Sequence, residues 1–214
     1  MYEAIIFDMD GTLIRTPVYY IIKTLESTLR KLGREIKINK DIATEFWYKD
    51  ERSRYIKNKF RIKDVELFWK EFIETDSPNK REEAISIYSD VSCLWMFKEK
   101  YKLKYGVLTN AHPKITEVEL DFLGRDLVDI VVNSHPHNGI KPKPDPEGAN
   151  YILDKLGVSN KKAIFVGDSE SDILCARNVP MKEILIDRYE HEVRINAEKL
   201  DNLNDMRWFL EYDY

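Results

Sequence analysis

Short apolar runs alternate with helix-like segments along most of the chain. The first run covers residues 3–8 and is followed at once by Asp10 and Gly11, a turn-forming pair. A short apolar run that stops at a turn signal is typical of a buried strand. Comparable runs, each predicted to be a strand, cover residues 103–109, 129–133, 162–167 and 183–187.

The gaps between the later runs carry helix signals. Pro113 can open a helix that ends at Gly124. Asp145 can cap another, with Pro146 as its first residue and Gly157 at its end. Strands that alternate with helices predict a parallel sheet. We therefore expect an α/β fold, a Rossmann-like parallel sheet with helices on both faces.

The gap between the first and second runs is too long for a single crossover. It holds about 90 residues, whereas a strand–helix–strand unit takes roughly 30 in all. Apolar positions recur at helical spacing in four stretches of this gap. We expect a small α-helical bundle of residues 16–80, inserted after the first strand into a core of residues 1–15 and 81–214. Its helices are expected to begin near Thr16, Asn39, Asp64 and Ser77.

Composition and charge narrow the class of protein. The 214 residues are 43% hydrophobic with a formal charge of -4, which favours one folded domain with an insertion and argues against a nucleic-acid partner. Cys93 and Cys175 have apolar neighbours and are too few for a disulfide framework. No stretch approaches the roughly 20 apolar residues of a membrane span. We therefore expect a cytoplasmic monomer or homodimer with no membrane partner.

Two acidic side chains follow the first predicted strand. Asp8 and Asp10 are two positions apart, so both project to one side if strand geometry continues, while Met9 points away. An isolated pair of this kind most often caps a turn. Ligands of open α/β sheets, however, bind beyond the carboxyl ends of the strands. The position therefore favours a binding or catalytic role for this pair.

Other predicted strands also end in polar groups. Thr109 and Asn110 follow the second run and can donate to phosphate oxygens, or cap the next helix. Asp168 and Asp172 follow the fourth run, and a helical start would place them on one face. Hard cations such as Mg²⁺ usually take only one or two protein carboxylates, so Asp8 and Asp168 could share one ion. Taken alone, an acidic turn is more often only solvated.

A proline-rich segment lies between these motifs. Three prolines stiffen residues 142–146, so a lysine of this segment, Lys141 or Lys143, can be aimed at a fixed point. A loop lysine is usually solvated. Acids and phosphate donors at the neighbouring strand ends make an active-site role more plausible.

Four segments carry these groups: residues 7–13 (FDMDGTL), 107–110 (VLTN), 143–146 (KPDP) and 167–172 (GDSESD). In order and spacing they resemble the four motifs of the haloacid dehalogenase-like (HAD) superfamily. The resemblance covers the core from end to end and points to the cap-bearing phosphatase branch, which includes phosphoglycolate phosphatases. It implies that the first strand lies at the centre of the sheet and that residues 16–80 form the family's α-helical cap.

The resemblance also implies phosphoryl transfer through a covalent intermediate. Asp8 would attack phosphorus, and Asp10 would protonate the departing alcohol and then take a proton from water. Mg²⁺ would be held by the Asp8 carboxylate, the Asp10 carbonyl and Asp168, with Asp172 in support nearby.

Thr109, Asn110 and a lysine would fix and neutralise the phosphate oxygens in this scheme. Two lysines start a Lys-Pro-x-Pro sequence, and both stay open for this role. The distance to later motifs favours Lys143 over Lys141.

Asp10 separates two branches of the family, because members that displace halide from carbon lack this second aspartate. The sequence therefore predicts a phosphatase that acts on a small phosphorylated metabolite. One alternative is a sugar-phosphate mutase of the same family. Another is a regulatory or binding protein that keeps the fold without catalysis.

Three further features have no assigned role in this scheme. Arg15 stands at the expected hinge into the cap, where it would contact a carboxylate or second phosphate of the substrate, or simply face solvent. The basic stretch at residues 49–63 would steer anions if it faced the cleft, although such a run is usually a solvated helix face. His135 and His137 lack a third ligand and stay unassigned.

Overall fold

The computed structural model describes residues 1–48, 52–134 and 139–212. The chain forms two compact units. We call Met1–Arg15 with Ser86–Tyr214 the core unit, and Thr16–Ile85 the helical unit. None of the helices in the described part of the chain is long and apolar enough to cross a membrane.

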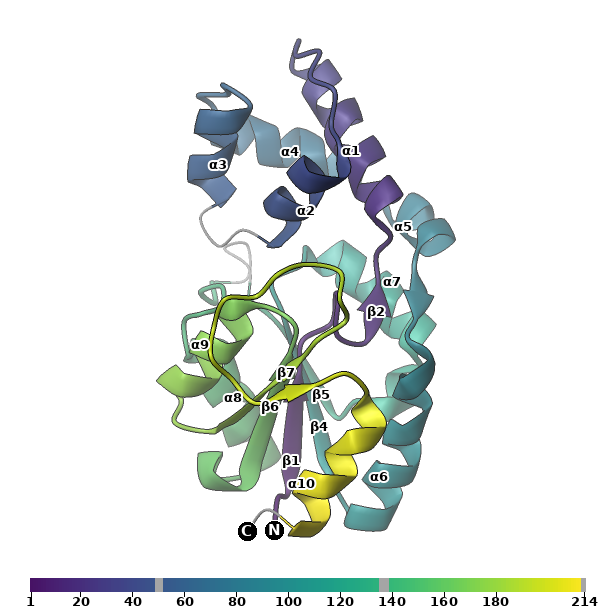
Figure 1. The fold of residues 1–214 in the computed structure, drawn as a ribbon, viewed down its shortest axis with the longest axis vertical. Helices are drawn as coiled ribbons and strands as arrows, with labels where there is room; N and C mark the ends of the chain where they lie inside the picture. Colours follow the sequence, from purple (N-terminus) through teal and green to yellow (C-terminus); the bar gives the residue numbers. More distant parts are fainter. Residues whose placement is uncertain (49–51, 135–138, 213–214) are drawn as a thin grey trace. The chain divides into compact units, whose positions relative to one another are not determined.

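The core unit is built on a six-stranded parallel sheet with the order β5-β4-β1-β6-β7-β8 (Figure 1). The first strand therefore lies between the strands that precede the second and fourth motifs, as the family resemblance implies. This α/β arrangement confirms the predicted fold class. The strands are β1 (Ala4–Phe7), β4 (Lys104–Thr109), β5 (Ile130–Asn133), β6 (Ala163–Gly167), β7 (Lys182–Ile186) and β8 (Lys199–Leu200).

The central strand is apolar because both of its faces are covered. All residues of β1 are buried, and Ile6 is in register with Gly106 on one side and Phe165 on the other. One face contributes Ala4 and Ile6 to an apolar cluster with α8 and α9. The helices of the core unit are α6 (Cys93–Tyr101), α7 (Pro113–Leu123), α8 (Glu147–Leu156), α9 (Glu170–Asn178) and α10 (Met206–Tyr212).

The opposite face of the sheet carries a second set of helices. The Tyr105 ring packs edge-on against Phe7 at 5.3 Å between ring centres. The Tyr105 hydroxyl donates to the Leu94 carbonyl of α6 at 3.0 Å. Glu211 of α10 accepts hydrogen bonds from Lys100 and Tyr101 of α6, so these two helices lie together. The sheet is thus covered on both sides, which explains why the strands other than β8 appear in the sequence as nearly continuous apolar runs.

A two-stranded antiparallel ribbon joins the segments where the chain leaves and re-enters the core unit. It pairs β2 (Ile14–Arg15) with β3 (Ser86–Ile87). This ribbon was not predicted from the sequence, and neither were β8, α10, α6 and the helix of residues 52–59. Strands of two residues are too short to show an alternating pattern.

The helical unit contains α1 to α5 and has an aromatic core. The Phe46 ring lies in the middle of this core. Its centroid is 5.7 to 6.2 Å from the centroids of the neighbouring rings, which belong to Tyr55, Phe60, Phe68, Trp69 and Phe72. The expected helices are present, and α3 occupies part of the basic stretch. The helices are α1 (Val18–Lys31), α2 (Lys40–Tyr48), α3 (Arg52–Lys59), α4 (Val65–Thr75) and α5 (Pro78–Ala84).

The second boundary of this unit differs from the expected one. The sequence analysis ended the insertion at residue 80, which lies inside α5, whereas the compact unit continues to Ile85. Arg81 explains the difference, because its guanidinium donates to the Thr16 hydroxyl at 2.7 Å and pairs with Asp76 at 3.2 Å. Both partners belong to the helical unit, so α5 packs as one piece with it.

Candidate active site

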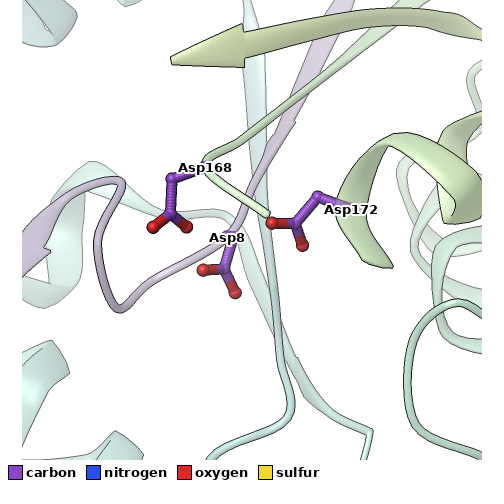
Figure 2. Close-up of side chains that lie close together, drawn as sticks. All are labelled: Asp8, Asp168 and Asp172. Atoms are coloured by element: carbon purple, nitrogen blue, oxygen red, sulfur yellow. The ribbon is translucent and has the colours of Figure 1, made fainter. Parts of the chain in front are cut away.

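Three buried carboxylates converge at the carboxyl ends of the central strands. Asp8 follows β1, while Asp168 and Asp172 lie after β6 and in the first turn of α9 (Figure 2). Each offers an oxygen atom, and these atoms lie within 4.8 Å of one another. The structure therefore brings together acids that are up to 164 residues apart in the sequence.

The turn after β1 is shaped so that Asp168 can approach it. The Met9 carbonyl accepts hydrogen bonds from the main-chain N–H groups of Leu13 and Ile14 at 2.9 and 3.0 Å, which closes the turn. Gly11 has a φ of +80°, and a Cβ atom there would lie 2.0 Å from Asp168 Oδ2. Only glycine accepts both this conformation and this close contact.

The Asp168 carboxylate has one held oxygen and one free oxygen. Its Oδ1 accepts a long hydrogen bond from the Thr12 hydroxyl at 3.4 Å. Its Oδ2 is buried and has no hydrogen-bond partner among the described residues. A buried carboxylate oxygen without a partner is costly, which indicates that a ligand belongs there.

The Asp172 carboxylate, by contrast, is fully engaged. Its Oδ2 accepts hydrogen bonds from the Ser169 main chain at 3.0 Å and from the Ser169 hydroxyl at 2.6 Å, which forms a capping box at the start of α9. Its Oδ1 accepts one from Lys143 Nζ at 2.6 Å. Asp172 therefore offers no free carboxylate oxygen, and its contacts are to Lys143 and Ser169.

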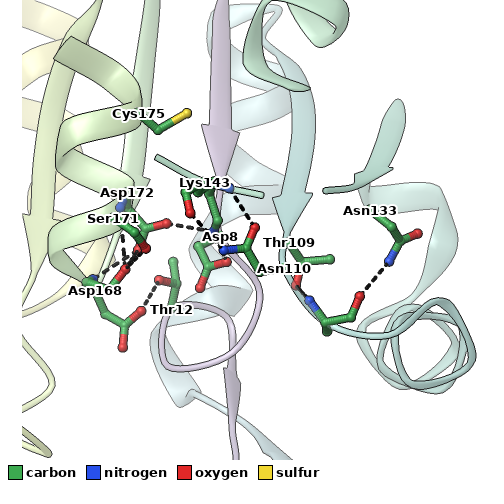
Figure 3. A network of polar contacts seen from close by, with 12 residues as sticks. Asp8, Thr12, Thr109, Asn110, Asn133, Lys143, Asp168, Ser171, Asp172 and Cys175 are labelled. Atoms are coloured by element: carbon green, nitrogen blue, oxygen red, sulfur yellow. Dashed lines mark hydrogen bonds and ion pairs between the residues drawn. The ribbon is translucent and has the colours of Figure 1, made fainter. Parts of the chain in front are cut away.

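Lys143, and not Lys141, lies within this cluster (Figure 3). Its Nζ pairs with Asp8 as well as with Asp172, and the side chain is buried. The Lys141 side chain is 72% exposed, and its Nζ lies 3.6 Å from Asp145. The geometry thus distinguishes two lysines that the sequence left open.

Asn110 holds the main chain of Lys143. Its Oδ1 accepts from the Lys143 N–H at 2.9 Å, and its Nδ2 donates to the Lys143 carbonyl at 3.3 Å. The amide group that we expected to bind phosphate thus positions the lysine. The buried Thr109 hydroxyl accepts the Ala111 N–H at 3.1 Å and keeps its own hydrogen to donate.

The electrostatics of the cluster reflect an excess of acids. Burial raises the pKa of Asp8 to about 7, assisted by the charges of Asp172 and Asp10 and opposed by Lys143. Burial, with Asp8 and Asp172, also raises the pKa of Asp168. Burial alone would lower the pKa of Lys143, but Asp172 and Asp8 outweigh it and raise this pKa. One ammonium group therefore faces three carboxylates.

A divalent cation fits this donor set. Mg²⁺ prefers carboxylate oxygens and is usually held by one or two of them. Asp8 and Asp168 meet that requirement, since Asp168 Oδ2 is free and Asp172 is already engaged. A bound cation would also offset the excess negative charge that raises the pKa values of these acids.

Two predicted site residues lie elsewhere in the same region. Asp10 is half-buried in the turn after β1, close enough to influence the pKa of Asp8. Arg15 lies on β2 with its side chain 56% exposed, and its guanidinium pairs with Glu190 at 2.8 Å. The structure therefore gives Arg15 an acidic partner within the core unit. His135, His137 and the first residues of the basic stretch lie outside the described residues.

The sequence analysis assigned no role to some residues that contact the site. Thr12 belongs to the first motif, but its bond to Asp168 depends on a fold contact across 156 positions. Arg188, in the loop after β7, donates to the Thr12 carbonyl at 2.8 Å. That loop carries no motif, so no sequence signal could have identified it.

Comparison with known proteins agrees with this geometry. Residues 5–186 match the family model described as haloacid dehalogenase-like hydrolase. The chain is 29% identical to phosphoglycolate phosphatase from Aquifex aeolicus over 187 residues, which cover 86% of this chain and 84% of that protein. It is 27% identical to pyrophosphatase PpaX from Listeria innocua, with 82% of this chain and 78% of that protein covered.

A solved structure has a similar fold along its whole length. The HAD phosphatase from Thermococcus onnurineus superposes with a TM-score of 0.66 at 25% identity, and 98% of each chain is covered. The family match spans most of the chain, including all the residues that form the cluster. The chain therefore belongs to the haloacid dehalogenase-like hydrolase family.

Proposed function

We propose that the protein is a magnesium-dependent phosphatase that hydrolyses a phosphomonoester of a small metabolite through an aspartyl-phosphate at Asp8. The observation that carries this proposal is the cluster of Asp8, Asp168 and Lys143 at the strand ends. An acid that can attack phosphorus, a free acidic oxygen for a cation and a fixed ammonium group lie together there. These are the groups that phosphoryl transfer requires.

In the first step, a carboxylate oxygen of Asp8 attacks the substrate phosphorus. A P–O bond to Asp8 forms while the P–O bond to the alcohol breaks, and Asp10 donates a proton to the departing oxygen. Asp10 lies two residues after the nucleophile in a turn closed by main-chain hydrogen bonds. That turn keeps the acid near the reacting atoms.

In the second step, a water molecule attacks the phosphorus of the aspartyl-phosphate. Asp10, now ionised, takes a proton from this water as the bond to Asp8 breaks. Inorganic phosphate leaves and the Asp8 carboxylate is regenerated. Asp10 thus serves first as acid and then as base, and its proton count is restored after each cycle.

Charge on the phosphate oxygens is balanced by fixed donors. Lys143 supplies its ammonium group, which Asn110 and Asp172 position through the main chain and the side chain. Thr109 supplies a hydroxyl hydrogen. A bound Mg²⁺, held by Asp8, the Asp10 carbonyl and Asp168, would supply further positive charge next to the transferred group. In this chemistry positioning and charge stabilisation provide most of the rate.

The relatives support a small substrate. The two curated relatives described above are named for phosphoglycolate and for pyrophosphate, both small phosphorylated compounds. We propose that the helical unit, inserted after β1 as in cap-bearing members, limits the size of the substrate. We further propose a cytoplasmic location, which agrees with two free and buried cysteines.

Phosphate release from a panel of phosphorylated metabolites and p-nitrophenyl phosphate tests the proposal. We expect release that requires Mg²⁺ and stops on addition of EDTA, with one or a few metabolites preferred. A sugar-phosphate mutase would interconvert isomers and release phosphate only slowly. If no compound releases phosphate in the presence of Mg²⁺, the phosphatase assignment is wrong and a binding role would replace it.

A further inference from the structure

We propose that Arg188 is a positioning residue that clamps the turn after β1 against Asp168 and thereby sets the geometry of the cation site. The inference rests on the proposed function, because it concerns the same carboxylates. Arg188 itself does not touch the reacting groups. It acts through Thr12, and so through a residue that contacts Asp168.

The first link of this chain of contacts is the Thr12 carbonyl. Arg188 donates to it from Nη2 at 2.8 Å, across 176 positions of sequence. Thr12 is completely buried, so its carbonyl has no access to solvent and needs a protein partner. The hydroxyl of the same residue donates to Asp168 Oδ1. Thr12 thus links the two side chains: its carbonyl accepts from Arg188, and its hydroxyl donates to Asp168.

The second link fixes Arg188. Its guanidinium makes a bidentate pair with Asp90, with Nη1–Oδ2 and Nη2–Oδ1 distances of 2.7 and 3.1 Å. The two side chains are only 7% and 4% exposed. Asp90 also accepts the Leu203 N–H at 2.8 Å, and the Tyr88 ring lies 4.0 Å below the guanidinium. Both Nη atoms are therefore held, whereas Nε has no hydrogen-bond partner among the described residues.

A buried ion pair of this kind calls for an explanation other than stability. Removing two charges from water costs several kcal/mol per ion in general, and apolar residues of similar volume often stabilise a fold as well or better. A planar fork that binds a carboxylate with two nitrogens and a carbonyl with one of them gives directional control that lysine cannot give. Positioning of the turn supplies a reason for the pair.

The contacts of the turn with Asp168 determine which of its two carboxylate oxygens stays available for a cation. With Oδ1 held by Thr12 and Gly11 packed against the carboxylate, Oδ2 is left as the oxygen without a partner. If the turn were released, the Asp168 carboxylate could rotate and the free oxygen would lose its fixed direction. We therefore expect loss of Arg188 to weaken cation binding before it affects substrate binding.

The test compares three variants with the wild type. Arg188→Met removes the clamp but leaves Asp90 buried without a partner, which threatens folding. Arg188→Met combined with Asp90→Asn also removes the clamp, while the asparagine oxygen can still accept the Leu203 N–H. Arg177→Met is the matched control, because Arg177 pairs with Glu183 on the surface of the same unit and is 40% exposed. Titration calorimetry with Mg²⁺ and thermal unfolding with and without Mg²⁺ provide readouts that need no turnover.

We expect the double variant to fold and to bind Mg²⁺ about 10- to 100-fold more weakly, the usual loss when a group behind a metal ligand is removed. Its turnover number at moderate Mg²⁺ should fall by a similar factor and recover in part at high Mg²⁺, with the KM for substrate little changed. Arg177→Met should match the wild type in all three readouts. A folded double variant with wild-type Mg²⁺ affinity and turnover would overturn the inference.

A further variant and the choice of readout separate the ways in which the inference can fail. Arg188→Lys keeps the charge but not the fork, so we expect it to restore stability without restoring Mg²⁺ affinity. Full rescue by lysine would contradict a positioning role. If the wild type binds Mg²⁺ but hydrolyses none of the compounds tested, the proposed function fails, while the effect of Arg188 on Mg²⁺ affinity is still measured.

Discussion

The two units each bury a cluster of charged side chains, but the clusters are balanced differently. In the core unit, Lys143 faces three carboxylates, and Asp168 Oδ2 has no partner among the described residues. In the helical unit, Asp76 faces Arg81 in a ratio of one to one. The first cluster has more acidic than basic groups, whereas the described ion pair of the second joins one acid to one base.

The described contacts of the Arg81 cluster join residues of the helical unit. Arg81 donates to Asp76 and to the Thr16 hydroxyl, and the Tyr20 hydroxyl donates to the other Asp76 oxygen at 2.6 Å. The Trp47 ring lies 5.1 Å from the Arg81 guanidinium. A cluster that satisfies its own charges is explained by structure alone. A cluster with surplus acids and a carboxylate oxygen without a described partner suits a cation, and this contrast supports the proposal that the core-unit cluster is the active site.

The largest expected effect concerns the nucleophile. Asp8→Asn should lower turnover by at least about 10⁴-fold, because an amide cannot form the covalent intermediate. The same change should leave the metal-free fold as stable as the wild type or more stable, since it removes one of the surplus acids. Phosphate release and thermal unfolding check both parts. Substantial activity in this variant would show that the covalent route is wrong.

The next largest effect should be a loss of folding stability, because the Arg81 cluster lies in the helical unit. Arg81→Met removes the buried ion pair between Arg81 and Asp76, which should cost about 3–5 kcal/mol in the free energy of unfolding. Adding Asp76→Asn should recover much of this loss, because the buried charge is then gone. Urea unfolding measures both variants. An Arg81→Met protein as stable as the wild type would show that the balanced cluster contributes nothing to the fold.

A smaller effect is expected from the residue that holds the lysine. Asp172→Asn replaces an oxygen that accepts from Lys143 and should lower turnover by about 10- to 100-fold, while the nucleophile stays in place. Asp121→Asn is the control, because Asp121 pairs with Arg125 on the exposed face of α7. Equal turnover in both variants would mean that Asp172 does not position Lys143.

The smallest predicted effect is a pH dependence of cation affinity. Mg²⁺ binds the ionised carboxylates, and the pKa of Asp8 is raised to about 7, so protons compete from neutral pH downwards. Affinity should fall about tenfold for each pH unit below 7 for each proton displaced. Calorimetric titration between about pH 5 and 8 measures this dependence.

The raised pKa values of Asp8 and Asp168 also determine how the stability of the metal-free protein changes with pH. An acid with a raised pKa in the fold stabilises it most below its ordinary pKa, and this stability is lost as the pH rises towards the raised value. Added Mg²⁺ should therefore stabilise the protein more at pH 8 than at pH 5. A cation affinity that stays constant down to pH 5 would contradict the raised pKa values.

The sequence predicted what depends on local patterns. Asp8, Thr109 and Asp168 each lie at the carboxyl end of a strand whose apolar run is visible, and the carboxyl ends of parallel strands meet at one edge. The sequence alone therefore predicts that these three residues lie close together at one edge of the sheet. Several helices were predicted for the same reason, because caps such as Asp64, which accepts the Leu67 N–H at 2.9 Å, are local signals.

Other features depend on contacts that no local pattern records. Spacing along the sequence favoured Lys143 over Lys141, but the contacts of Lys143 Nζ with Asp8 and Asp172 depend on the fold. Arg188 and Asp90 pair across 98 positions, and neither stands in a motif. The β2–β3 ribbon has two residues on each side, too few for a period. Tertiary packing decides all of these.

The most direct test of the surplus-acid interpretation is an anomalous diffraction map from crystals grown with Mn²⁺, which binds the same oxygen ligands as Mg²⁺. We predict one strong peak within bonding distance of the Asp8 carboxylate and Asp168 Oδ2, and its loss in an Asp168→Asn crystal. A map with no peak between these two carboxylates, at saturating Mn²⁺, would contradict the account.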